Sequence, residues 1–283
     1  MSDASVRRMS DASIRGMSDA ASPHRLPDPV MILGLPVHPL TLVQAVAHLR
    51  AATGRAPVTV VSLNGALLMR ALRDPPVREA VAGAGLVIPD GIGVLLAARI
   101  LGAPVQNRLA GVDLAEALCA AAAGVGGTVF LLGAAPGVAE AAGARLQERF
   151  PGLVVAGTAH GFFTPEEEPA LLERIRGAAP EIVLVALGAP RQELWLHTHR
   201  NRLGAAVLMG VGGTLDVLAG RARRAPRWVQ TAGLEWLYRA VRQPWRWSVI
   251  KTIPPLFLIA LRERLRPRRP SRSAPGTAPP QEK

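Results

Sequence analysis

Residues 58–65 read VTVVSLNG, an apolar and β-branched run that ends in a polar residue and a glycine. Such a run is typical of a strand covered on both faces, because a strand with one face in water alternates polar and apolar residues. Comparable runs recur along the chain. The strands predicted from them are Val58–Leu63, Leu86–Ile88, Thr128–Leu132, Leu153–Ala156, Ile182–Leu187 and Ala206–Val211.

Segments of helical periodicity separate these runs. The helices predicted from them are Thr41–Ala52, Gly65–Arg73, Ile92–Leu101, Val112–Ala123, Val138–Phe150, Pro165–Arg176 and Arg191–Arg202. Repeated alternation of strand and helix predicts an α/β fold with a doubly wound, mostly parallel, Rossmann-like sheet. In such sheets the functional site lies beyond the carboxyl ends of the strands.

The formal net charge of +12 is confined to the end of the chain. Residues 1–220 carry 18 basic and 18 acidic side chains, whereas residues 221–283 carry 15 basic and three acidic ones. We expect a disordered N-terminal tail over 1–28, an α/β domain over 29–225, a helical C-terminal appendage over 226–266 and a disordered basic tail over 267–283. The Met-Ser-Asp-Ala repeats allow either Met1 or Met17 as the start. No segment predicts a transmembrane helix or a signal peptide.

Polar, glycine-containing turns follow four of the predicted strands. Because parallel strands end at the same edge of a sheet, we expect these turns to form one site. Glycine lets a ligand approach the backbone closely, and helix N-termini favour phosphate groups. The candidate residues in the four turns are Ser62, Asn64, Asp90, Gly91, Gln192, Gly212 and Gly213.

Asp90 and Arg108 carry the most specific chemistry near these turns. Asp90 ends a strand among apolar residues and glycines, a setting suited to a general base, although an Asp-Gly turn explains it equally well. Arg108 precedes a helix, where a guanidinium can bind a diphosphate with two hydrogen bonds, although most arginines are solvated surface groups.

Several cofactor and metal motifs are missing. The nearest approach to a dinucleotide fingerprint, Gly210-Val211-Gly212, has Leu215 where the third glycine belongs, and the chain has no Walker A sequence. There is no Asp-x-Asp pair to hold a metal–diphosphate complex, and His197 and His199 would diverge on a helix. We therefore predict no metal and no cofactor.

Six motifs in order along the chain point to one family. They are PDGIG at Pro89–Gly93, RLAGVDL at Arg108–Leu114, GAPRQE at Gly188–Glu193, GVGGTLD at Gly210–Asp216, RAPRW at Arg224–Trp228 and GLEWLYR at Gly233–Arg239. Together they resemble the WecG/TagA/CpsF glycosyltransferases over about Ile32 to Arg246. The resemblance implies an inverting, metal-independent hexosyltransferase or N-acetylhexosaminyltransferase. Its expected donor is a UDP-sugar, with N-acetylmannosamine favoured and UDP-glucose or UDP-glucuronate as alternatives. Its expected acceptor is an undecaprenyl-diphosphate-linked sugar of cell-surface polysaccharide, teichoic acid or exopolysaccharide synthesis.

The resemblance also implies roles for individual residues. Asp90 is then the catalytic base, and Ser62, the second catalytic residue, occupies a position where the family usually has threonine. The substrate-binding residues implied are Asn64, Gly91, Arg108, Gln192, Gly212, Gly213, Arg239 and Arg246. Arg239 and Arg246 lie in the predicted appendage, which is expected to fold over the site.

The composition of the appendage indicates an anionic membrane surface as a partner. Tryptophans and arginines alternate there, and the apolar run Leu256–Leu261 is expected to enter the lipid boundary. The alternative is a helix that packs on the sheet as part of the core. Cys119 is the one cysteine, which fits a reducing compartment. We expect a cytoplasmic protein, peripheral on the inner face of the cell membrane, and the sequence leaves a homo-oligomer open. The alternating tryptophans and arginines of the appendage are Trp228, Trp236, Trp245, Trp247, Arg227, Arg239, Arg242 and Arg246.

Two classes of protein compete with a transferase. A nucleic-acid-binding protein would use the basic tail but would leave the strand-end motifs without a role, and no nucleic-acid-binding module is visible. An NAD(P)-dependent oxidoreductase would suit the fold but needs the glycine fingerprint that the chain lacks. We therefore expect a UDP-sugar and a lipid-linked acceptor as partners, and no nucleic acid.

Overall fold

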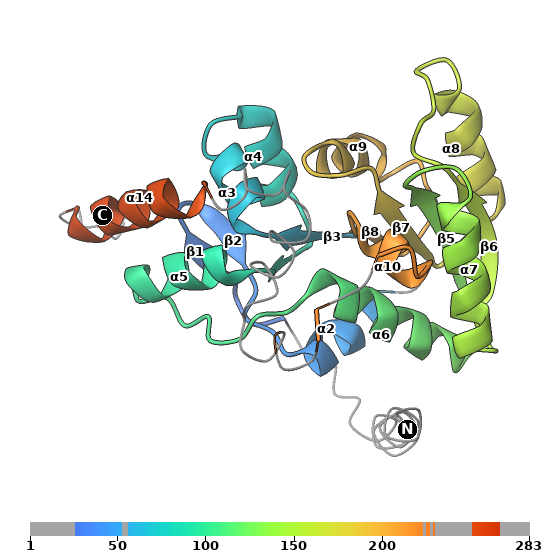
Figure 1. Ribbon diagram of the computed structural model, residues 1–283, viewed down its shortest axis with the longest axis horizontal. Coiled ribbons are helices and arrows are strands. Elements are labelled where there is room, and N and C mark those ends of the chain that lie inside the picture. The colour runs from blue at the N-terminus through green and yellow to red at the C-terminus, as the bar shows by residue number, and fades with distance from the viewer. Residues whose placement is uncertain (1–25, 53–55, 223–224, 227–228, 230–250, 267–283) are drawn as a thin grey trace, which may run out of the picture.

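A six-stranded, entirely parallel sheet forms the centre of the computed structural model, which describes residues 26–52, 56–222, 225–226, 229 and 251–266. The strand order is β4-β3-β8-β7-β5-β6, and Figure 1 shows the part of it from β3 to β6. The strands are β3 (Val58–Leu63), β4 (Leu86–Pro89), β5 (Thr128–Gly133), β6 (Val154–Ala159), β7 (Ile182–Ala186) and β8 (Val207–Gly210). A separate antiparallel hairpin joins β1 (Val30–Ile32) to β2 (Leu35–Val37).

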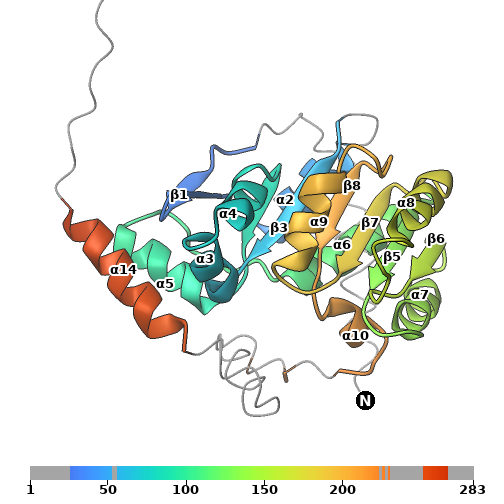
Figure 2. The ribbon, with the colours of Figure 1, turned by 90° about the horizontal axis from the view of Figure 1, so that it is seen from above.

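Helices cover both faces of the sheet, as the predicted doubly wound fold requires. Residues of α2, α6, α7 and α10 pack on one face, and residues of α3, α4, α5, α8, α9 and α14 pack on the other. In Figure 1, α2 and α6 lie below the sheet and α4 and α9 above it, and Figure 2 shows the same arrangement from above. The helices are α2 (Leu42–Arg50), α3 (Gly65–Ala71), α4 (Pro75–Ala82), α5 (Ile92–Leu101), α6 (Gly111–Ala123), α7 (Val138–Arg149), α8 (Glu168–Gly177), α9 (Arg191–His199), α10 (Thr214–Leu218) and α14 (Ile253–Leu265).

Successive side chains of the central strands enter opposite halves of the core. Val60 of β3 packs with the α2 and α6 side, and Val61 packs with the α3 and α5 side. Leu131 and Leu132 of β5 divide in the same way between the two faces. Because both faces are dry, apolar residues are favoured at every position of these strands.

The predicted α/β fold is confirmed, and all six predicted strands are present with ends shifted by at most three residues. The sequence did not predict the β1–β2 hairpin or α10, because the hairpin strands have three residues each and α10 has five. It also did not predict α4. A capping box forms before α8: the Thr164 N–H donates to Glu167 Oε2 at 2.8 Å, and the Glu167 N–H donates to Thr164 Oγ1 at 3.4 Å. A turn intervenes, however, and α8 begins only at Glu168.

The described part of the appendage is the helix α14, which has Pro254 and Pro255 in its first turn, where proline is tolerated. Leu256 and Ala260 are buried against the cluster formed by α3 and α5, and Figure 1 shows α14 beside α5. Leu256 Cδ2 lies 3.4 Å from the position a Cβ would take on Gly93 and 3.6 Å from that on Gly65. The helix α14 therefore packs on the first turns of α3 and α5.

The predicted tails and much of the appendage, including its four tryptophans, fall in residues 1–25, 230–250 and 267–283 and at 227–228, which lie outside the described residues. Within the described ranges, no helix is long and apolar enough to cross a membrane.

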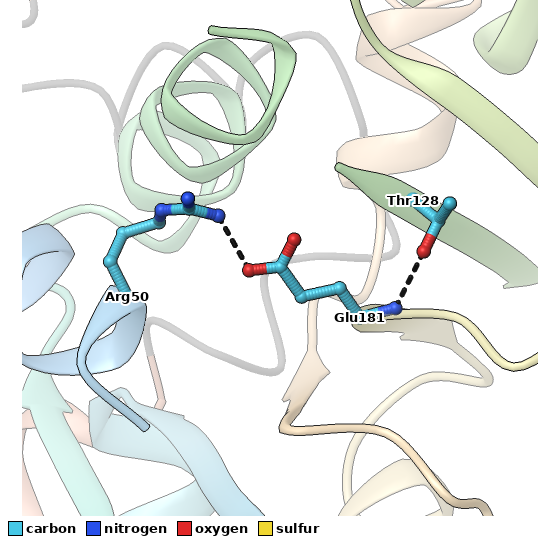
Figure 3. A network of polar contacts seen from close by, with 3 residues as sticks. All are labelled: Arg50, Thr128 and Glu181. Carbon is cyan, nitrogen blue, oxygen red and sulfur yellow. Dashed lines mark hydrogen bonds and ion pairs between the residues drawn. The ribbon is translucent and has the colours of Figure 1, made fainter. Parts of the chain in front are cut away.

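A polar network joins α2 to the amino ends of two strands (Figure 3). Arg50, the last residue of α2, forms an ion pair with Glu181, which directly precedes β7. The Glu181 N–H donates to Thr128 Oγ1 at 2.8 Å, and Thr128 is the first residue of β5. Both charged side chains are mostly shielded, with 26% of Arg50 and 15% of Glu181 exposed. The network therefore fixes α2 at the edge of the sheet opposite to the carboxyl ends.

Replacing Glu181 tests this fixation. Glu181→Gln removes the charge while its backbone bond to Thr128 can persist, so we expect the free energy of unfolding to fall by about 1 kcal/mol. For a domain of this size, that corresponds to a melting temperature lower by roughly 2–4 °C. Thermal and urea unfolding measure the change. Glu173→Gln, which breaks the exposed Glu173–Arg176 pair, is the matched control and should change stability by less than about 0.5 kcal/mol. Equal effects of the two substitutions would contradict the prediction.

Candidate active site

The Asp90 carboxylate is held by the first turn of α6. Asp90 directly follows β4, and its backbone N–H donates to the Leu63 carbonyl at the end of β3, at 2.8 Å. Asp90 Oδ2 accepts the N–H of Gly111, the first residue of α6, at 3.0 Å. That N–H is one of the donors left unpaired by a helix N-terminus, where the helix dipole favours a negative charge. The carboxylate is thus oriented by a fixed backbone group.

The Ser62 hydroxyl lies next to the same residue, Gly111. A Cβ built on Gly111 would overlap the Ser62 hydroxyl and would lie 3.4 Å from Asp90 Oδ2. The hydroxyl and the carboxylate therefore both face the α-carbon of Gly111, which has room for no side chain. Ser62 Oγ is buried and has no hydrogen-bond partner among the described residues. The structure brings the two predicted catalytic residues together around one glycine.

Asn64 follows the last residue of β3, and Gly91 directly follows Asp90. Asn64 is the N-cap of α3, and its Oδ1 accepts the N–H groups of Ala66 and Leu67, both at 3.0 Å. Gly91 precedes α5 with a φ of 113°, which glycine alone adopts without strain. A Cβ built on Gly91 would lie 3.6 Å from Asn64 Cβ. The oxygen of Asn64 is thus committed to the helix, which leaves its amide NH2 group for a ligand.

Arg108 lies in the segment between α5 and α6. Its neighbour Leu109 donates its N–H to the carbonyl of Pro89, the last residue of β4, at 3.0 Å. This bond holds the backbone of Arg108 beside the strand end that leads into Asp90. The Arg108 side chain is half-buried.

Gln192 reaches the turn after β8. The Gly212 N–H donates to Gln192 Oε1 at 3.0 Å, and Gln192 Nε2 donates to Glu193 Oε1 at 2.7 Å. Gly212 has a φ of 52°, and Gly213 is the N-cap of α10. The predicted residues Gln192, Gly212 and Gly213 therefore form a second group, held together by one side-chain amide.

The two groups sit on neighbouring strands. Val60 of β3 is paired with Met209 of β8, so Ser62 and Val211 each lie two residues beyond a shared pair. The remaining predicted site residues, Arg239 and Arg246, lie outside the described residues. Within the part that the structure describes, no three His, Cys, Asp or Glu side chains gather as a metal site requires.

Sequence reasoning missed two participants, Gly111 and Glu193, although both stand in quoted motifs. Gly111 is indistinguishable in sequence from any glycine at the start of a helix, because its role depends on β3, β4 and α6 meeting in space. Glu193 is 2% exposed. Burial raises the pKa of its carboxyl, and the hydrogen bond from Gln192 acts in the opposite direction. A glutamate in the first turn of a helix is normally taken for a solvated residue that favours the helix dipole.

A parallel doubly wound sheet with a carboxylate, a hydroxyl and helix N-termini at its carboxyl edge defines the class of Rossmann-like α/β enzymes. The sequence profile of the Glycosyl transferase WecG/TagA/CpsF family matches residues 30–270. The chain belongs to this family and is a glycosyltransferase, as the six motifs had indicated.

Two relatives are similar to this protein over most of the chain. One, from Bacillus subtilis strain 168, is 32% identical over 204 residues, which cover 72% of this chain and 79% of that protein. The other, from Bacillus spizizenii, is 35% identical over 195 residues, which cover 69% of this chain and 75% of that protein. Both are named N-acetylglucosaminyldiphosphoundecaprenol N-acetyl-β-D-mannosaminyltransferase.

A methyl group on Gly111 tests the geometry of the site. Gly111→Ala forces the Ser62 hydroxyl to move, while the new methyl makes only an ordinary contact with the Asp90 carboxylate. We therefore expect sugar transfer to fall by about 100-fold or more, as when a catalytic group is misplaced by about 1 Å. Overpacking should also cost about 1–3 kcal/mol of stability. Initial rates and thermal unfolding measure the two effects.

Gly124→Ala is the matched control on the same helix. Gly124 is the C-cap of α6 in a right-handed conformation, and a Cβ there meets only an ordinary contact, 3.6 Å from the Ala121 carbonyl oxygen. Its activity should equal that of the unsubstituted protein. Full activity of Gly111→Ala would show that the function of the two predicted catalytic side chains does not depend on this contact.

Proposed function

We propose that this glycosyltransferase moves an N-acetylmannosaminyl group from a UDP-sugar to undecaprenyl-diphosphate-linked N-acetylglucosamine. The names of both relatives support the sugar and the acceptor. The observation that carries the chemistry is the Asp90 carboxylate, which is oriented by the Gly111 N–H and lies beside the Ser62 hydroxyl.

In the proposed reaction, Asp90 acts as a general base on the acceptor. With Oδ2 bound to Gly111, Oδ1 accepts the proton of the attacking sugar hydroxyl. The hydroxyl oxygen forms a bond to the anomeric carbon, and the bond from that carbon to the diphosphate oxygen breaks. UDP leaves with the bonding electron pair, and attack from the opposite face inverts the configuration. Ser62 and the Asn64 amide position the substrates.

The growing negative charge on UDP needs stabilisation. Arg108 is the described residue best suited to this role, because its backbone is fixed next to Asp90 and a guanidinium can bind a diphosphate at two oxygens. Removing one well-placed donor of this kind typically costs about 3–4 kcal/mol of transition-state stabilisation. Arg239 and Arg246 are proposed to complete the diphosphate clamp from the appendage.

We propose that α14 holds the enzyme on an anionic membrane surface, where the lipid-linked acceptor resides. The burial pattern corrects the expectation that the whole run Leu256–Leu261 enters the lipid, because Leu256 and Ala260 face the core. The opposite side of the helix exposes an apolar stripe with helical spacing. Its members and their exposed fractions are Phe257 (42%), Leu258 (53%), Leu261 (38%) and Leu265 (72%). The exposed Arg262 and Arg266 flank this stripe, as in an interfacial helix.

Removing the base tests the mechanism. Asp90→Asn keeps the size and the Gly111 hydrogen bond but accepts no proton, so transfer should fall by about 10²–10⁴-fold, the usual contribution of a general base. Binding of the UDP-sugar, measured by calorimetry, should stay within about threefold of that of the unsubstituted protein, since the base acts on the acceptor. Turnover of Asp90→Asn at the rate of the unsubstituted enzyme would refute the assignment.

The donor is identified with a panel of UDP-sugars. UDP-N-acetylmannosamine, its uronate, UDP-glucose and UDP-glucuronate are incubated with a short-chain polyprenyl-diphosphate-N-acetylglucosamine, and UDP release is followed. We expect release with UDP-N-acetylmannosamine alone. Release with another member of the panel would revise the donor, and release without acceptor would argue against transfer to the lipid.

Serine substitutions on α14 test membrane binding. Phe257→Ser together with Leu258→Ser removes two half-exposed apolar side chains, worth about 1 kcal/mol each when they enter lipid. Partitioning onto vesicles of anionic phospholipid should therefore weaken by roughly 30-fold. The control pair Val125→Ser and Val154→Ser removes comparably exposed residues at the other edge of the sheet, 68% and 48% exposed, and should bind like the unsubstituted protein. Equal losses in the two pairs would exclude α14 as the membrane contact.

A further inference from the structure

Glu193 is a buried acid that the proposed chemistry does not use. It lies in the first turn of α9, directly after Gln192, and both side chains are buried, at 2% and 5% exposure. Its Oε1 accepts one hydrogen bond, from Gln192, and its Oε2 has no hydrogen-bond partner among the described residues. A carboxyl group in this position lowers stability, because its desolvation is only partly compensated.

The hydrogen bonds around Gln192 run in one direction. Glu193 Oε1 accepts from the Gln192 NH2 group at 2.7 Å, and Gln192 Oε1 accepts from the Gly212 N–H at 3.0 Å. If the amide turned over, its oxygen would face the Glu193 carboxyl oxygen and its NH2 group would face the Gly212 N–H. The first contact would be repulsive while Glu193 is ionised, and the second would be repulsive in either protonation state of Glu193. An acceptor at position 193 therefore selects a single orientation of the Gln192 amide.

The backbone leaves room for this arrangement. A Cβ built on Gly210, the last residue of β8, would lie 2.9 Å from Gln192 Nε2, so any side chain there would displace the amide. The amide consequently lies against the end of β8 and bonds to the turn that follows it. That turn begins beside the end of β3, because β3 and β8 are paired through Val60 and Met209.

We propose that Glu193 is a positioning residue: it locks the Gln192 amide so that Gln192 holds the Gly212–Gly213 turn against the active-site edge of the sheet. The carboxyl acts through Gln192 and does not touch a substrate. Burial raises its pKa, which favours the neutral acid, and the neutral acid still offers Oε1 as an acceptor. The proposal rests on the proposed function only in that the turn serves the transfer reaction.

Four variants test the proposal: Glu193→Met, Glu193→Gln, Gln192→Leu, and Glu193→Met combined with Gln192→Leu. Methionine keeps the length of the side chain but offers no comparable acceptor. Glu193→Met should therefore melt at the same or a higher temperature than the unsubstituted protein, while kcat/KM for transfer falls by about tenfold or more, mainly through KM. Glu193→Gln retains an acceptor oxygen and should keep kcat/KM within about threefold.

The double variant shows whether Glu193 acts through Gln192. If it does, Glu193→Met adds no loss once Gln192 is leucine, and the double variant should equal Gln192→Leu alone. Losses that multiply would overturn the proposal. So would kcat/KM of Glu193→Met equal to that of the unsubstituted enzyme, or failure of that variant to fold, since either would assign the carboxyl no role or a role in folding.

A measurement without substrate separates this proposal from the choice of sugar. With 15N-glycine labelling, the exchange of the Gly212 amide proton should be faster by up to about tenfold in Glu193→Met, as expected from weakening one hydrogen bond. Glu193→Gln should leave it unchanged. Unchanged exchange in Glu193→Met would refute the positioning role, whichever sugar the enzyme transfers. Faster exchange with no transfer by the unsubstituted enzyme would instead count against the proposed reaction.

Discussion

The pairing of β3 with β8 is the contact on which the rest of the structure depends. It joins the first strand of the sheet to the last through Val58 with Val207, Thr59 with Leu208 and Val60 with Met209. On one side of this seam lie β3 and β4, whose ends carry Ser62 and Asp90. On the other lie β8 and β7, followed by Gly212 and Gln192. Because the strands are parallel, their carboxyl ends meet at one edge, and two groups of residues 102 to 150 positions apart in sequence become neighbours.

The pairing of β3 with β8 joins residues far apart in the sequence, and such contacts separate what the sequence could predict from what it could not. Ile92–Leu101 has the predicted bounds, since a helix that starts after a glycine and ends at one is marked by local signals. The order of the strands is different, because it depends on contacts between residues far apart along the chain. The role of Gly111 could not be predicted for the same reason: nothing near it in the sequence shows that Ser62 and Asp90 approach it from two strands. The buried state of Glu193 likewise depends on the packing of α9 against β8.

The helix α14 shows how one segment serves both the core and the surface. Leu256 and Ala260, one turn apart, fill the seat formed by α3 and α5, while Phe257 and Leu258 face outward. The net charge of this segment could not predict which of its apolar side chains are buried and which are exposed, because the basic residues carry no information about burial. Arg264 adds a polar tie, since its guanidinium donates to the carbonyl of Ile100 at the end of α5 at 3.0 Å. A helix seated on the first turns of α3 and α5 touches the elements that carry Asn64 and Gly91, so the surface that we propose contacts lipid is mechanically linked to the site.

Several buried polar atoms of this protein have no hydrogen-bond partner among the described residues. Each costs about 1–3 kcal/mol, a large share of the stability of a single domain, so a fold retains them only where something offsets the loss. Five such side-chain atoms occur among the described residues, and three of them are on Thr59, His197 and His199. The other two, Ser62 Oγ and Glu193 Oε2, belong to residues that flank the carboxyl edge, one on each side of the β3–β8 pairing. Ser62 faces the α-carbon of Gly111 next to a carboxylate, where a bound sugar hydroxyl would supply its partner. The other carboxyl oxygen of Glu193, Oε1, accepts a hydrogen bond from Gln192. Replacing either residue by an apolar one would remove this cost, and it would also remove the hydroxyl that we propose to face the acceptor or the carboxyl that we propose to orient the turn beside it. We therefore attribute the stability lost at these two positions to the transfer reaction that we propose for this edge of the sheet.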